Sequence, residues 1–211
     1  MAKEKFEEEK VEVEVETKEE EEKGILDFIV DSEESLKDIT ECTKRMTKAT
    51  QEIGKNMQQR TAEVRKIAKS RVPGAASRIH RIATASAKDM IQYAKKLEEE
   101  QPKYHNAWES FDENTTGLVQ TTRIHTKEDK EAAVKFRSSV DRLQSAIGLA
   151  LKGAQVCREA IASMRGISRD VNRASKRTAH ILDLLISDLE GADSYCTKVL
   201  TLIEEKIKKE G

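Results

Sequence analysis

Apolar residues recur at alternating steps of three and four along most of this chain, and this spacing constrains the fold more than any other feature. Four such stripes begin near Leu36, Ala76, Ala133 and Val171, and each continues over many turns. The spacing places the apolar side chains on one face of an α-helix, and that face must then be buried. The chain therefore predicts four long amphipathic helices.

The composition favours an all-α fold. Only 2 prolines and 9 glycines interrupt the 211 residues, and aromatic residues make up 4% of the chain. β-Sandwiches, barrels and α/β folds need many turns and strands rich in β-branched and aromatic residues. We therefore expect helices packed on helices.

Start and stop signals divide the stripes into separate helices. Asp31 and Ser32 suit a helix start. Val72-Pro73-Gly74 suits a stop, because the residue before a proline leaves the α region. Pro102 interrupts the second stripe without changing its register, which predicts a kink or a one-turn break.

Further signals lie in the second half of the chain. Thr126 followed by Asp129 resembles a capping box. Gly166 suits the position after a helix C-terminus, and Ser168 suits the start of the next helix. The expected helices cover about residues 31–72, 75–123, 126–165 and 168–208.

Nearly equal helix lengths and short turns predict the arrangement of the helices. We expect an elongated antiparallel up-down-up-down four-helix bundle with coiled-coil-like packing over residues 24–208. A second interpretation keeps Gly166 inside a single helix of about 80 residues, because the heptad phase does not slip there. In that case the chain would assemble as an extended multimeric coiled coil.

The N-terminal segment differs from the rest in composition. Residues 1–23 contain five Lys and eleven Glu but almost no apolar residues, which predicts a mobile, disordered acidic tail. The apolar residues 24–30 that follow are interpreted as a lead-in packed against the bundle before the first helix starts. The alternative is an anchor for a partner or a membrane interface.

The net charge of −1 hides a polarised distribution. Residues 54–96 hold eleven Lys/Arg and two acidic residues, and residues 150–187 hold seven and three. If the chain turns back at Pro73 and at Gly166, these two basic stretches lie at the same end. The candidate partner-binding basic tip consists of Arg65, Lys66, Lys69, Arg71, Arg78, Arg81, Arg165, Arg169, Arg173, Lys176 and Arg177.

No pattern of catalytic or ligand-binding residues stands out. The chain has no Walker-type loop, no G-x-G-x-x-G, no G-x-S-x-G and no H-E-x-x-H, so we expect no enzyme, no cofactor and no metal. His105 and Glu109 are spaced as a metal pair but have no second half, and a solvated pair is the expectation. Tyr104, Trp108 and Phe111 have the spacing of a core cluster. Three widely spaced cysteines are interpreted as buried apolar residues in a reducing compartment: Cys42, Cys157 and Cys196.

These features predict a cytoplasmic interaction or scaffolding module whose basic tip contacts an acidic protein surface. The acidic tail of another copy is one such surface. The first alternative is a protein that binds an anionic surface, a membrane headgroup layer or nucleic acid, and the second is a structural coiled-coil oligomer. No apolar run approaches the roughly 20 residues needed to cross a bilayer, and the Met1-Ala2-Lys3-Glu4 start does not resemble a signal peptide.

Overall fold

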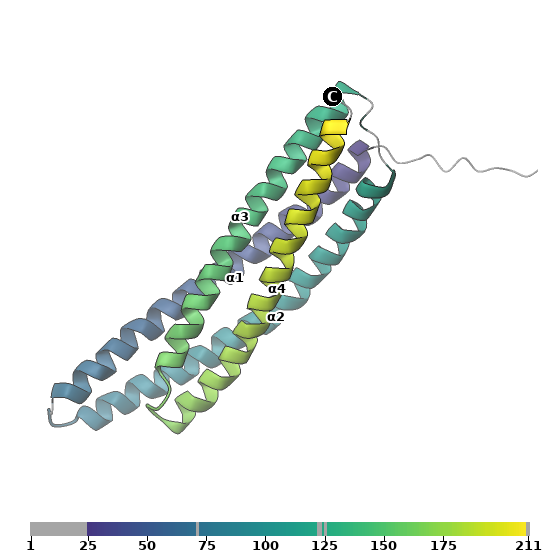
Figure 1. Ribbon diagram of the computed structural model, residues 1–211. Coiled ribbons are helices and arrows are strands. Elements are labelled where there is room, and N and C mark those ends of the chain that lie inside the picture. The colour runs from purple at the N-terminus through teal and green to yellow at the C-terminus, as the bar shows by residue number, and fades with distance from the viewer. Residues whose placement is uncertain (1–24, 71, 122–123, 125, 210–211) are drawn as a thin grey trace, which may run out of the picture.

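The computed structural model describes residues 25–209, apart from 71, 122, 123 and 125. This part of the chain forms an elongated bundle of four helices and contains no strand (Figure 1). The helices are α1 (Ile25–Ser70), α2 (Ala75–Thr121), α3 (Lys127–Ser163) and α4 (Arg169–Lys209). The predicted all-α four-helix bundle is confirmed. The predicted acidic tail, residues 1–23, lies outside the described residues.

The four helices run alternately up and down as two hairpins, α1–α2 and α3–α4. α1 packs against α2 and α3, and α4 packs against the same two helices. The chain therefore passes from α2 to α3 across the diagonal of the bundle, and the neighbours α1 and α3 run parallel (Figure 1). The break at Gly166 is a real turn, so the interpretation as one long helix is wrong.

The core follows the stripes predicted from the spacing. All ten stripe positions of the third helix region, from Ala133 to Met164, are buried. The largest fully buried side chains include Tyr104, Phe111 and Phe136, and the rings of the two phenylalanines have their centroids 6.3 Å apart. Apolar burial of this kind is the main term that stabilises a bundle.

Hydroxyl groups inside the core are mostly satisfied by hydrogen bonds. Thr50 Oγ1 and the Tyr93 hydroxyl are 2.6 Å apart, and Thr178 donates to the Met90 carbonyl oxygen at 3.2 Å. Since buried polar groups are costly only when unpaired, these bonds let small polar residues occupy stripe positions. Burial raises the pKa of Tyr93 well above its usual range, so its phenol stays protonated.

The first helix begins earlier than expected. α1 starts at Ile25, so Asp31 and Ser32 lie within it and do not form its start. Ile29 and Ser32, which are 5% and 0% exposed, extend the 3-4 stripe backwards from Leu36. Packing of this extra stretch on the other helices outweighs the local start signal, as tertiary contacts commonly do.

Two other local signals have clear outcomes. The capping box at the start of α3 is confirmed, since Asp129 N donates to Thr126 Oγ1 at 3.0 Å and Thr126 N donates to an Asp129 carboxylate oxygen at 2.9 Å. The break considered at Pro102 is absent, because α2 is a single helix from Ala75 to Thr121.

The turn glycine Gly166 allows a test of the hairpin geometry. Gly166 has φ +91°, in the left-handed region, where an L-residue costs about 1–2 kcal/mol. Gly166→Ala should therefore lower the free energy of unfolding by about 1–2 kcal/mol in urea titrations. The control is Gly148→Ala in the middle of α3, where an added Cβ meets no heavy atom within 4 Å and stability should rise. Equal changes in the free energy of unfolding for the two substitutions would contradict the left-handed conformation of Gly166 in the turn.

Candidate functional site

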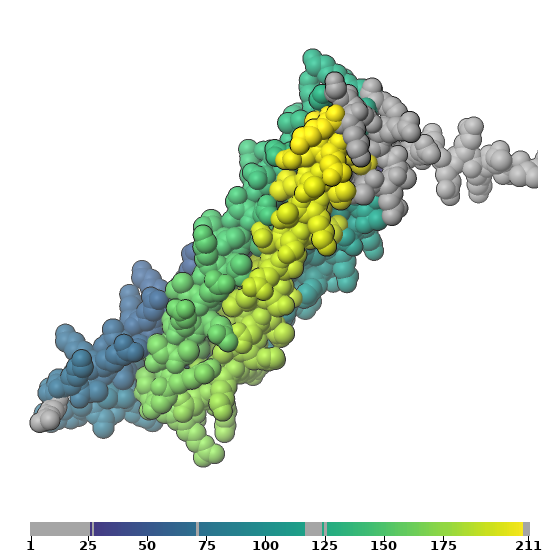
Figure 2. Space-filling view, in the orientation of Figure 1, coloured from purple at the N-terminus to yellow at the C-terminus, as the bar shows by residue number. Residues whose placement is uncertain are grey.

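The two interhelical turns lie at the same end of the bundle, but they are not level. Thr61 of α1 lies beside the end of α3, with its hydroxyl 3.0 Å from Ser163 Oγ and 2.9 Å from Met164 Sδ. α3 ends at Ser163, whereas α1 continues to Ser70. At about 1.5 Å per residue, the α1–α2 hairpin extends roughly 10 Å beyond the α3–α4 turn. Figure 2 shows this step at the lower left.

The α2–α4 pair gives the same offset. Thr178 of α4 is hydrogen-bonded to Met90 of α2, so the start of α4 at Arg169 is level with Arg81. α2 starts at Ala75, more than a turn further out. We call residues 62–82, which run from the level of the α3–α4 turn out to the α1–α2 turn and back, the projecting hairpin.

Backbone and side-chain hydrogen bonds close both turns. In the first turn, Ala75 N donates to the Val72 carbonyl at 3.1 Å, and Gly74 adopts φ +81°. In the second turn, Ser168 Oγ accepts from Val171 N at 3.2 Å, which confirms Ser168 as the cap of α4. Asn172 Oδ1 accepts from Gly166 N at 2.8 Å. These contacts hold the basic side chains on defined backbone at both turns.

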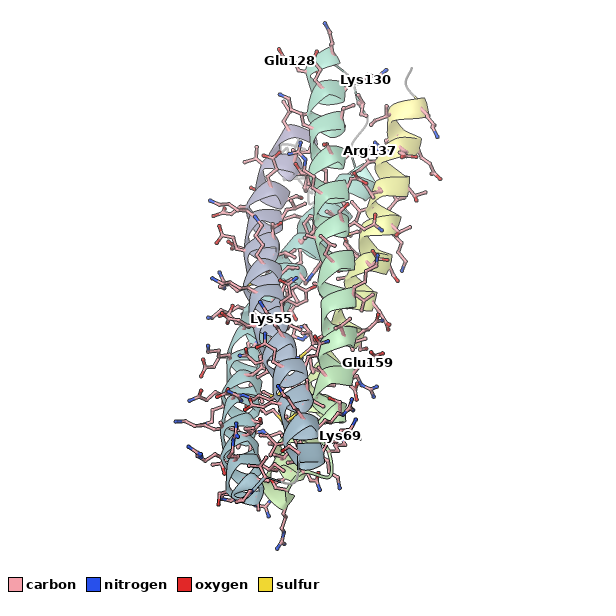
Figure 3. The ribbon with its side chains drawn as sticks, turned by 90° about the vertical axis from the view of Figure 1, so that its left-hand side faces the viewer. Lys55, Lys69, Glu128, Lys130, Arg137 and Glu159 are labelled. Atoms are coloured by element: carbon pink, nitrogen blue, oxygen red, sulfur yellow. The ribbon has the colours of Figure 1, made fainter. Side chains whose placement is uncertain are left out.

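The predicted basic residues divide into three groups along this end. The projecting hairpin carries Arg65, Lys66, Lys69, Arg78 and Arg81. Arg165 and Arg169 flank the α3–α4 turn, and the members set one to two turns back along α4 are Arg173, Lys176 and Arg177. All ten are exposed, and Arg71 lies outside the described residues. Figure 3 shows Lys69 at this end and Glu128 and Lys130 at the opposite end.

Some of these cations already have partners within the bundle. One Arg177 guanidinium nitrogen lies 2.9 Å from both carboxylate oxygens of Glu98, so Arg177 is paired far from the tip. Arg165 Nε donates to Ser175 Oγ at 3.2 Å. Arg177 is therefore a poor candidate for partner binding, and Arg165 is partly engaged.

The cations of the projecting hairpin are not paired with carboxylates among the described residues of the bundle. Within the described part of the chain, no ion pair involves any of its five cations. Arg60, just before the hairpin, neutralises Asp89 at 2.7 Å, so that carboxylate does not offset the tip. In sequence, residues 62–82 hold six Lys/Arg and one acidic residue.

The two helix ends at this tip have opposite dipoles. Lys69 lies in the last turn of α1, where it offsets the negative end of that helix dipole, and the first turn of α2 contains no acidic residue to offset the positive end. Arg78 and Arg81 follow within the first two turns. Like charges held together repel one another, and an anionic partner removes that cost.

The sequence interpretation missed a second surface feature. Tyr104 and Phe111 are fully buried as predicted, but Trp108 is only half-buried and borders a groove between α2 and α4. The groove joins residues 104–112 with residues 187–195. Spacing within one helix cannot show which other helix will lie beside it, so no sequence signal pointed to this groove.

The cysteines Cys42, Cys157 and Cys196 are buried, as predicted. Burial raises the pKa of Cys157 and of Cys196 to about 12, so both stay protonated at neutral pH. Within the described ranges, no group of three or more His, Cys, Asp or Glu residues could hold a metal ion. None of the four helices, over the residues described, is long and apolar enough to span a bilayer.

Comparison of the chain with protein-family models, with curated proteins and with solved structures gives no match. The assignment of function therefore depends on the geometry and charge of the bundle itself.

Proposed function

We propose that this protein is a non-enzymatic interaction or scaffolding module that uses the projecting hairpin to bind an acidic protein segment. The observation that carries the proposal is the set of five exposed cations on that hairpin without an ion pair among the described residues. Arg165, Arg169, Arg173 and Lys176 extend the basic surface behind the step. Arg177 is left out because Glu98 already pairs with it.

The step between the two hairpins favours a narrow partner over a flat one. A flat headgroup layer that meets the bundle end-on touches the projecting hairpin first and stays roughly 10 Å from the α3–α4 turn. An acidic segment can instead lie along the step and reach the cations of the projecting hairpin as well as those at the α3–α4 turn. A membrane surface or nucleic acid is therefore the alternative partner that we propose second.

The chain itself supplies one acidic segment. Residues 1–23, with eleven Glu and five Lys, would span roughly 25–30 Å as a coil. The projecting hairpin lies at the far end of helices about 60 Å long, so the segment of a neighbouring copy is a better match than the chain's own. We use this segment as the test ligand.

A charge-neutralised variant tests the proposal. Lys66, Lys69, Arg78 and Arg81 are each replaced by Gln in the full chain, and binding of a labelled peptide of residues 1–23 is measured by fluorescence anisotropy. Exposed charge pairs contribute about 0.2–1 kcal/mol each, so losing four should weaken binding by roughly fourfold at the low end and by more than a hundredfold at the high end. Raising the salt concentration should also weaken binding of the peptide to the unsubstituted protein.

The matched control replaces four exposed lysines in the middle of the bundle, Lys44, Lys48, Lys95 and Lys96, by Gln. The control should change affinity less than threefold, because it has the same net charge but an intact tip. An equal loss of affinity in both variants would mean that binding depends only on the net charge of the protein, and this would overturn the proposal. Tighter binding of anionic vesicles or of a DNA duplex than of the peptide would instead favour a membrane surface or nucleic acid as the partner.

A further inference from the structure

The groove between α2 and α4 lies about 40 Å from the projecting hairpin along the bundle. Its volume is about 430 Å³, and it extends over two helical turns on each wall. The wall from α2 runs from Tyr104 to Asp112, and the wall from α4 runs from Ser187 to Tyr195. This volume lies within the range of small-molecule sites in proteins.

Aromatic rings form one part of the lining. Trp108 packs edge to face against Tyr104 and Tyr195, with ring centroids 6.1 and 5.8 Å apart. Phe111 supports Trp108 from the core at 5.5 Å. The Tyr195 hydroxyl is 2.6 Å from Thr115 Oγ1, which fixes the ring. The Tyr195 ring is therefore held by a hydrogen bond, and the Trp108 ring by edge-to-face contacts with its neighbours.

Carboxylates form the rim. Glu109 and Asp112 come from α2 and Asp188 from α4, and no Lys or Arg among the described residues lines the groove. Asp188 accepts a hydrogen bond from Gln101 at 2.9 Å and lies 3.5 Å from His105 Nε2. Glu109 and Asp112 have no ion pair within the described residues. The groove is therefore aromatic, acidic and open.

Gly191 leaves the groove unfilled. A Cβ placed at Gly191 would meet no heavy atom within 4 Å, although the residue lies in α4 beside the aromatic rings. A larger residue would suit the helix better, since glycine lowers helix stability. The space at this position is thus available to a ligand.

We propose that this groove binds a small organic cation, with a quaternary ammonium group against the half-buried rings of Trp108 and Tyr195 and the acidic rim. Ring faces attract cations through their quadrupoles, and quaternary ammonium groups are recognised by aromatic cages. Carboxylates at the rim add long-range attraction and select against anions. The site is separate from the projecting hairpin, so the protein would bind a small ligand in addition to its acidic partner.

The chain contains a built-in probe for this site, because Trp108 is its only tryptophan. Choline is titrated into the full-length protein at low salt while Trp108 fluorescence is followed, and calorimetry gives a second measure of affinity. We expect a saturable response. The neutral isostere, in which a tert-butyl group replaces the trimethylammonium group, should bind at least about fivefold more weakly.

Two leucine variants locate the site. Gly191→Leu should fill the groove and weaken choline binding at least about tenfold. Gly148→Leu, on α3 with equally open space, is the matched control and should leave the affinity unchanged. Circular dichroism confirms that each variant is folded.

Three results would overturn the proposal: no saturable response to choline, equal affinity for the neutral isostere, or full affinity in Gly191→Leu. A response to an oligolysine peptide without one to choline would assign the groove to a protein partner instead, and would overturn the small-ligand assignment.

Discussion

Replacing Phe111 with alanine should lower the free energy of unfolding by about 3–5 kcal/mol. Phe111 is 0% exposed and touches aromatic rings from three helices: Trp108 on its own helix, Phe136 on α3 and Tyr195 on α4. Alanine removes the apolar surface of the ring and leaves a cavity that these rigid neighbours cannot fill. Urea titration followed by circular dichroism measures the loss.

The control for this prediction is Leu149→Ala on the outer surface of α3. Leu149 is 65% exposed, so its truncation should change stability by less than about 0.5 kcal/mol. Because natural domains are stable by only about 5–15 kcal/mol, the Phe111 variant should lose a large part of its stability. A loss near that of Leu149→Ala would contradict the described core.

Replacing Gly54 with leucine should also destabilise the bundle, by about 1–3 kcal/mol. A Cβ at Gly54 would lie 3.3 Å from Cα of Cys157 and 3.4 Å from its Cβ. The nearest obstacle is backbone, which cannot move aside as a flexible side chain can. Leucine at this point therefore forces the parallel helices α1 and α3 apart, although it favours the helix itself.

Gly148→Leu is the matched control for Gly54→Leu. It also introduces leucine into the middle of a helix, but its Cβ meets no heavy atom within 4 Å. Stability should stay level or rise by up to about 1 kcal/mol. If both leucine variants have the same stability in urea titrations, the close packing of α1 on α3 at Gly54 is contradicted.

Local patterns in the chain were enough to predict the helices. The ten stripe positions from Ala133 to Met164 are buried because a 3-4 spacing can face only one side of a helix. The capping box at Thr126 was also predictable, since donor and acceptor are three residues apart. The prediction of a helix start near Asp31 was wrong because packing of Ile29 and Ser32 outweighed the local signal.

The candidate sites depended on information that lies far apart in the sequence. Both basic turns could be predicted from Pro73 and Gly166, but the step between them depends on the register of α1 against α3. By sequence position Arg177 is equivalent to its neighbours, but in the bundle it pairs with Glu98 of another helix. The aromatic groove depends on α2 lying next to α4, and their spacing patterns alone do not specify this neighbour.

The sequence by itself determined that this chain forms four amphipathic helices with turns at Gly74 and Gly166, because period and turn chemistry are local properties. Only the tertiary structure decided the diagonal connection, the projecting hairpin and the groove at Trp108. The physical reason is that an apolar stripe requires burial but accepts many partners, so neighbour and register are set by how all four faces pack together.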